Sequence, residues 1–124
     1  MAERKGPVGG ADATEPVELR RLRRRIDALD RRIVGLLNER ARLAREAGQA
    51  KTAAGWTAIR DAEREREILL RVSMANEGPT PQADLLAVFK RLFAVARSLA
   101  RRDRLRERRT ASFGDPAGNP EDER

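Results

Sequence analysis

Two cations occupy positions of a helical stripe that should be apolar. Within residues 37–51, "LNERARLAREAGQAK", Arg40 and Lys51 keep the spacing of the apolar residues upstream. On a helical wheel with Leu22 at zero, Arg40 falls at about 0° and Lys51 at about 20°. Because an unpaired buried cation is costly, an anionic group must meet both side chains. The pattern predicts binding of a small anion; the alternative is an internal salt bridge, or long side chains that reach past the helix edge.

A second charged cluster precedes the apolar face of the next segment. Stepping back along that face reaches Glu65 and Asp61, with Arg64 beside them in the run "RDAERE". Taken alone, this run fits a surface cluster of ion pairs, which contributes a few tenths of a kcal/mol. Since the two stripe cations lie only a loop away, a buried polar pocket is the better interpretation.

Arg23 lies at the edge of the first stripe, about 25 Å from Arg40 along the helix axis. It cannot reach a pocket around Arg40 in its own chain. It could reach the pocket of a second copy if two such helices pack antiparallel about a two-fold axis. This spacing favours a site shared between two subunits.

The elements that must position these side chains are three helices, since no convincing strand alternation is present. The first helix is predicted to start after Thr14 as N-cap and to run to about residue 54, and the second covers about 58–76. The third has Thr80 as N-cap and Pro81 as its first residue, and ends in "RRDRLRERR". The stripe of the first helix consists of Leu22, Ile26, Leu29, Ile33, Leu36 and Leu37, followed by Ala44 and Ala47. The stripe of the third contains Leu85, Phe89, Leu92, Phe93, Ala96, Leu99 and Ala100. A helix as long as the first needs partners along its length.

The domain organisation follows from composition. We expect a disordered tail over residues 1–13, one helical domain over 14–109 and a disordered acidic tail over 110–124. Only four residues are Trp, Tyr or Phe, so the core of a lone chain would be thin and oligomerisation is favoured. No stretch predicts a membrane span or a secretory leader, and we expect a cytoplasmic protein.

Composition also restricts the chemistry. The sequence contains neither cysteine nor histidine, which excludes a thiol nucleophile and a zinc cage, and removes the commonest general base. Any reaction must rely on Arg, Lys, Asp, Glu, and hydroxyl or amide groups. The net charge of +7 fits nucleic acid, a membrane surface or a small anion as partner.

The order of these motifs resembles the all-helical chorismate mutase family over about residues 17–105. The matching pieces are "LRRLRRRIDALDRRIVGLLNER", then "G-x-x-K" ending at Lys51, then "RDAERE". The resemblance implies an intertwined homodimer of three-helix chains with shared active sites. It also implies conversion of chorismate, a small dicarboxylate, to prephenate, in the biosynthesis of aromatic amino acids.

The resemblance implies a role for each candidate residue. Arg40 and Lys51 would act in their own subunit, and Arg23 would enter the site of the partner. Glu65 would accept the ring hydroxyl of the substrate, with Asp61 close by and Arg64 as the arginine of the second helix.

The implied reaction agrees with the absence of histidine. The rearrangement is unimolecular and pericyclic, so no cofactor, metal or nucleophile is expected. It requires arginines that clamp carboxylates, a lysine beside the ether oxygen, and restriction of a flexible dianion to a compact conformer.

The third helix departs from the family pattern. Family members usually place a Gln or Glu there as a second donor to the ether oxygen, and a polar residue four positions earlier. Alignment on Phe89 puts Ala100 and Ala96 at these positions, and neither can donate. Either the enzyme is weak alone, or an enzyme partner activates it, or its substrate differs.

Three alternatives stay open. A relative acting as an isochorismate pyruvate lyase or a 4-amino-4-deoxychorismate mutase would share the fold. A basic helical dimer that binds nucleic acid through "RRDRLRERR" and "RRLRRR" is of another class, but these runs lack interleaved aromatic residues. A coiled-coil scaffold would leave Arg40 and Lys51 unexplained.

Overall fold

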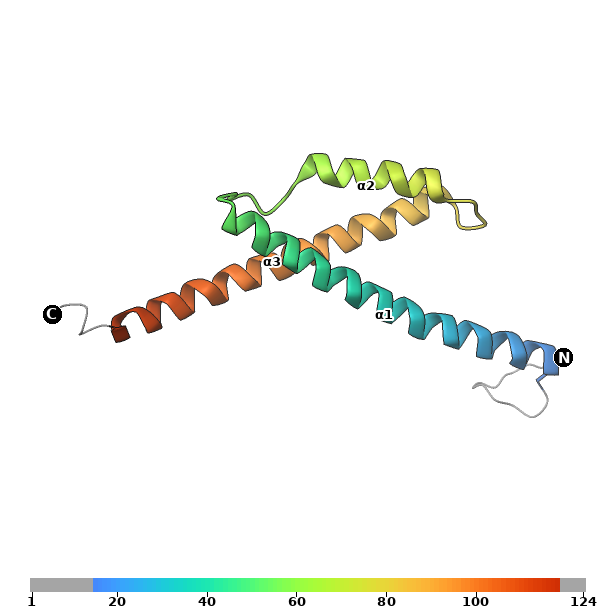
Figure 1. The fold of residues 1–124 in the computed structure, drawn as a ribbon. Coiled ribbons are helices and arrows are strands. Elements are labelled where there is room, and N and C mark those ends of the chain that lie inside the picture. Colours follow the sequence, from blue (N-terminus) through green and yellow to red (C-terminus); the bar gives the residue numbers. More distant parts are fainter. Residues whose placement is uncertain (1–14, 119–124) are drawn as a thin grey trace, which may run out of the picture. The chain divides into compact units, whose positions relative to one another are not determined.

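The computed structural model describes residues 15–118 and, within them, contains three α-helices and no strand. They are α1 (Val17–Ala53), α2 (Ala62–Ala75) and α3 (Gln82–Gly118), as Figure 1 shows. The predicted all-helical class, with one very long N-terminal helix, is confirmed. The predicted tail over residues 1–13, the N-cap Thr14 and residues 119–124 lie outside the described residues.

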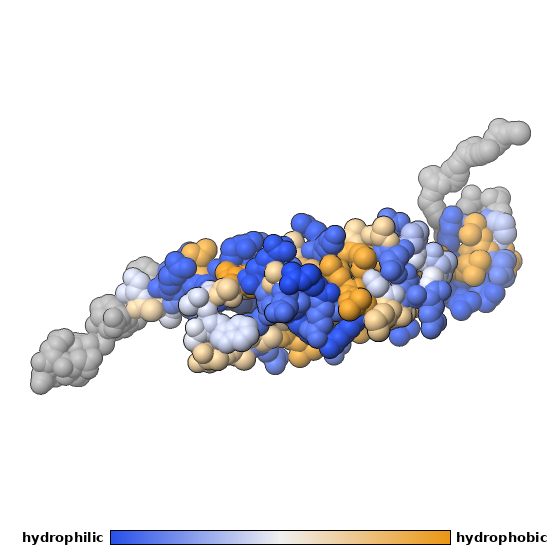
Figure 2. Space-filling model, turned by 90° about the horizontal axis from the view of Figure 1, so that it is seen from above, coloured by the Kyte–Doolittle hydropathy of each residue, from blue (hydrophilic) through white to orange (hydrophobic). Residues whose placement is uncertain are grey.

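The chain divides into two units, residues 1–40 and 41–124. The described part of the first unit consists of Glu15, Pro16 and the first two thirds of α1. Its apolar stripe is exposed: the side chains of Leu22, Ile26, Leu29, Ile33, Leu36 and Leu37 are between 39 % and 58 % accessible. Figure 2 shows hydrophobic patches on a surface that is otherwise mostly hydrophilic. The stripe predicted from the sequence is therefore present, and nothing in the described part of the first unit covers it.

In the second unit, α1 ends at residue 53 through a glycine that adopts the left-handed conformation. Gly55 has a φ of 92°, and its N–H donates to the carbonyl of Thr52 at 3.0 Å. The N–H of Trp56 donates to the carbonyl of Lys51 at 2.9 Å. This pair of bonds is the Schellman arrangement, which satisfies the last carbonyls of a helix. The predicted break at "AAGWT" is confirmed.

Helix α2 begins later than predicted. Asp61 is its N-cap, and its side chain accepts a hydrogen bond from the N–H of Arg64 at 3.0 Å. An aspartate at this position satisfies a helix N–H that would otherwise lack a partner, so the helix starts there rather than at Ala58. Asn76 is the C-cap, where the prediction had the helix end.

Helix α3 runs beyond the predicted boundary at residue 109 and ends at Gly118. Residues 101–112 are rich in Arg, a good helix former, and contain no Gly or Pro. The change in composition near residue 110 therefore does not mark the end of the helix.

Helices α2 and α3 lie side by side in the second unit, α2 along the N-terminal part of α3 (Figure 1). Phe93 of α3 is the buried residue of this packing, with 6 % of its surface accessible, and no other residue is buried where side chains are described. Because the apolar core is so small, polar contacts must contribute much of what holds the unit together.

One such contact joins the C-terminal part of α1 to α3. Arg45 donates to Asp103 through Nε at 3.0 Å and through Nη2 at 2.7 Å, a bidentate ion pair. Farther along α3, Arg104 donates from Nη1 to the carbonyl of Thr57 at 2.6 Å. The hydrogen bond from Arg45 lowers the pKa of Asp103 and raises the pKa of Arg45. A planar guanidinium fits a carboxylate in this way, so the pair orients α1 against α3.

None of the described helices is long and apolar enough to cross a membrane.

We expect the Arg45–Asp103 pair to stabilise the second unit in a pH-dependent way. The folded-state pKa of Asp103 lies below its ordinary value of 3.8. Its contribution is thus complete above that value and is lost as the pH falls through the folded-state pKa. Asp103→Asn should lower the Tm at neutral pH, and the difference from wild type should disappear in strong acid.

Thermal melts followed by circular dichroism across this pH range measure the effect. Asp30→Asn, at an exposed position of α1, is the matched control. A constant difference in Tm between the Asp103 variant and wild type at every pH would contradict the assignment.

Candidate functional site

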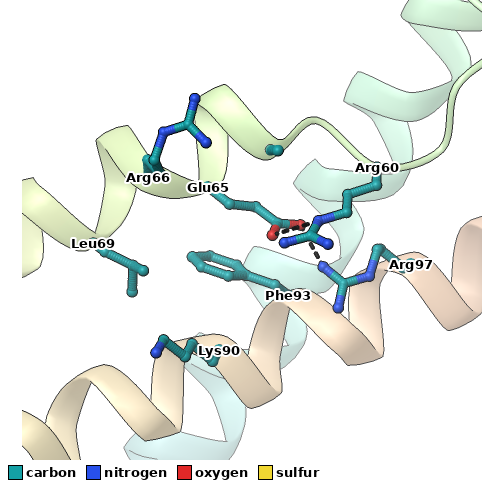
Figure 3. A pocket seen from close by; sticks show the side chains of 8 residues that line it. Arg60, Glu65, Arg66, Leu69, Lys90, Phe93 and Arg97 are labelled. Carbon is teal, nitrogen blue, oxygen red and sulfur yellow. Dashed lines mark hydrogen bonds and ion pairs between the residues drawn. The ribbon is translucent and has the colours of Figure 1, made fainter.

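Glu65 of α2 lies at the centre of the candidate site. Arg60 donates from Nε to one carboxylate oxygen at 3.3 Å, and Arg97 of α3 forms an ion pair through Nη1 with the other. The side chain of Glu65 is only 15 % exposed. Figure 3 shows the carboxylate between the two guanidinium groups. These two ion pairs therefore join the segment before α2 to α3 and fix the direction of Glu65.

A cavity of about 230 Å³ opens beside this cluster, between α2 and α3. Phe93, Leu69 and Ala62 supply its apolar lining. The charged lining consists of Arg60, Arg66, Lys90, Arg97 and Glu65. Four cations against one carboxylate leave an excess of positive charge, which favours an anionic ligand.

Lys51 lies at the end of α1, over the loop that leads to α2. Its ammonium is 5.7 Å from the ring centre of Trp56 and 3.9 Å from a carboxylate oxygen of Asp61. The side chain of Lys51 is 30 % exposed. Lys51 thus has a carboxylate of its own chain nearby, as in the alternative of an internal salt bridge, and the Schellman turn places Trp56 against the same side chain.

Arg64 points along α2 rather than toward Glu65. Its guanidinium pairs with Glu67 at 2.9 Å, and Arg71 pairs with the same carboxylate at 3.0 Å. Together with Arg71, the hydrogen bond from Arg64 lowers the pKa of Glu67. Arg64 therefore belongs to a surface cluster of ion pairs, which was one interpretation of "RDAERE". Glu65, in contrast, lines the cavity.

The other residues predicted for the site are Arg23, Arg40, Ala96 and Ala100. Arg23 lies in the first unit, where it pairs with Glu15, and about half of its side chain is exposed. Arg40 is half-buried at the end of the first unit. Ala96 and Ala100 are half-buried on α3 and, as expected, offer no donor. The convergence of Arg23 and Arg40 on the site of the second unit stays a prediction.

Arg60 and Arg97 were not predicted from the sequence as site residues. A signal for Arg97 was available, because it lies four residues after Phe93 and seven after Lys90, and so shares their helical face. The predicted face of the third helix was defined by apolar residues alone, among them Phe89, Leu92 and Phe93. The face toward α2 is instead rotated toward Arg97.

Among the described residues, no group of three or more Asp or Glu side chains is arranged to hold a metal ion. The chemistry available to the site is that of positioned cations, one oriented carboxylate and an apolar wall. Such a site can bind a small anion, restrict its conformation and stabilise negative charge that develops on it.

Fold and site together define an all-helical protein with a cavity lined mainly by arginine and lysine. The chain belongs to the chorismate mutase type II family, whose model matches residues 22–101. This is a family of isomerases, and the resemblance noted from the sequence is confirmed.

Two curated relatives are bifunctional chorismate mutase/prephenate dehydratases. That of Aquifex aeolicus is 37 % identical over 89 residues, which cover 68 % of this chain and 24 % of the relative. That of Stutzerimonas stutzeri is 35 % identical over 91 residues, covering 69 % and 25 %. The chain thus spans about a quarter of the length of these relatives.

The fold also matches a solved structure, a chorismate mutase (form II) from Thermus thermophilus. The TM-score is 0.65 at 34 % sequence identity, and the match covers 68 % of this chain and 96 % of the other. These matches favour the chorismate mutase assignment over the lyase, the aminodeoxychorismate mutase and the nucleic-acid alternatives.

The single tryptophan of the chain reports on the position of Lys51. Because the ammonium lies over the Trp56 ring, Lys51→Ala should change the intensity or wavelength of tryptophan emission. Lys90→Ala, which removes the lysine on α3, is the matched control and should leave the spectrum unchanged. Identical spectra for wild type and Lys51→Ala would show that the ammonium does not lie against the ring in solution.

Proposed function

We propose that this chain is a chorismate mutase, which converts chorismate to prephenate. The observation that carries the proposal is the family match over residues 22–101, because it includes Lys51, Asp61 and Glu65 in their expected order. The excess of positive charge at the cavity fits a dianionic substrate.

The mechanism follows from what the reaction requires. Chorismate is a flexible dianion, and its rearrangement needs a compact conformer in which the bond-forming carbons approach each other. Guanidinium groups hold planar carboxylates in a defined orientation, which removes conformational freedom before the barrier is reached. As the ether bond breaks, negative charge grows on its oxygen, and the ammonium of Lys51 stabilises it.

Glu65 has a separate role in this proposal. Its carboxylate accepts a hydrogen bond from the ring hydroxyl of the substrate, with Asp61 nearby at the N-terminus of α2. The pairing with Arg60 and Arg97 supports this role, because it holds the carboxylate toward the cavity (Figure 3). Arg64 contributes if its pair with Glu67 opens when substrate binds.

We propose that the active unit is a homodimer with shared sites. The exposed stripe of the first unit supports it, since a helix with so much exposed apolar surface gains free energy from a second copy. Arg23 then reaches the site of the partner, while Arg40 completes the site of its own chain. The basis of this arrangement is the family resemblance and the length of α1.

Chorismate consumption by the purified chain tests the function, with prephenate identified by chromatography. We expect Lys51→Ala to lower kcat/KM by about 10²–10³, the usual loss when one donor to a developing anion is removed. Arg71→Ala, which removes a cation that is 64 % exposed on α2, is the matched control.

Two outcomes would contradict the proposal. Wild-type chain that leaves chorismate intact is one of them. The other is conversion of isochorismate to pyruvate and salicylate, or rearrangement of 4-amino-4-deoxychorismate, in preference to chorismate.

A further inference from the structure

Helix α3 needs a donor to substrate that its expected positions do not supply. Ala96 and Ala100 lie where a polar side chain was expected, and both are half-buried. A chorismate mutase that depends on Lys51 alone for the ether oxygen would lose part of the stabilisation of the developing charge. Given the proposed function, on which this inference rests, a donor from another residue of α3 would restore that stabilisation.

Arg97 is the polar residue of α3 that the structure brings to the cavity. It follows Ala96 directly and lies one turn after Phe93, the buried residue between α2 and α3. Its side chain is only 25 % exposed, because the guanidinium turns inward to Glu65. Figure 3 shows it approaching the carboxylate from the α3 side. The small side chain of Ala96 adds no bulk beside it.

The contact with Glu65 places Arg97 beside the predicted substrate. Glu65 is the group that would accept a hydrogen bond from the ring hydroxyl. A guanidinium bonded to Glu65 therefore lies next to a residue that would contact the ligand. The ion pair is made through Nη1, whereas a guanidinium carries five N–H donors in a planar fork. Arg97 can therefore hold Glu65 and donate to the substrate at the same time.

Arg60 makes this sharing feasible. It pairs with one oxygen of Glu65, at 3.3 Å, while Arg97 pairs with the other. If Arg97 rotates toward an incoming anion, Glu65 keeps one cationic partner and is not left unpaired in a half-buried place. A charged guanidinium is also a stronger donor to a developing anion than a neutral amide.

We infer that Arg97 is the α3 residue that donates to the bound substrate, in place of the side chain absent at Ala96 and Ala100. It is a catalytic residue in the strict sense, because the inference requires direct contact with the substrate.

Steady-state kinetics with chorismate test this inference. Arg97→Ala should lower kcat by about 10²-fold with a smaller change in KM, since the lost donor acts mainly on the developing charge. Arg97→Gln, which keeps a neutral donor, should retain intermediate activity. Arg102→Ala, an exposed cation of the same helix, should behave as wild type. Thermal melts establish that each variant is folded.

Two further variants separate direct donation from an indirect role. Ala100→Gln restores a donor at the expected position, so it should recover about tenfold activity in the Arg97→Ala background, part of what one such donor contributes. In a Glu65→Gln background, Arg97→Ala should still lower kcat, because its effect does not pass through Glu65 alone.

The inference is overturned if Arg97→Ala keeps wild-type kcat, if Ala100→Gln recovers nothing, or if the effect disappears when Glu65 is Gln. Active wild type with any of these results refutes the role of Arg97 and leaves the proposed function intact. Inactive wild type refutes the proposed function and this inference together.

Discussion

The carboxylate of Glu65, paired on one oxygen with Arg60 and on the other with Arg97, is the interaction around which the candidate site is built. It joins three pieces of chain: the loop before α2, the first turns of α2 and the middle of α3. A unit whose described side chains bury only Phe93 cannot rely on apolar packing to fix these pieces. The ion pairs therefore add to the contact of Phe93 in holding these pieces together.

The same reliance on polar contacts explains the pair between Arg45 and Asp103. A bidentate pair fixes both distance and orientation, whereas an apolar contact between two helices allows sliding. The Schellman turn at Gly55 has a comparable effect on α1, because it ends the helix at one place and directs Trp56 and Lys51 toward the loop. Polar geometry thus aligns the parts that carry the candidate site.

Positioned charge is also what the proposed reaction needs. A unimolecular rearrangement of a dianion gains from conformational restriction and from donors aimed at the oxygen that becomes negative. A sequence without histidine or cysteine is sufficient for that chemistry. The arginines that pair with Glu65 also line the space that a substrate would occupy. The same cations can therefore join the helices and attract an anionic ligand.

The sequence by itself determined the three helices, because hydrophobic periodicity, caps and glycine breaks are local signals. It also placed Lys51, Asp61 and Glu65 in one region, since they are separated only by a short loop. It could not show that Arg64 turns to Glu67, or that Asp61 starts α2, because each outcome is a competition between neighbouring partners. Only the tertiary structure decided that α3 presents Arg97 to Glu65. The stripe of a helix shows which face is buried, but the neighbouring helix determines which edge of that face meets it.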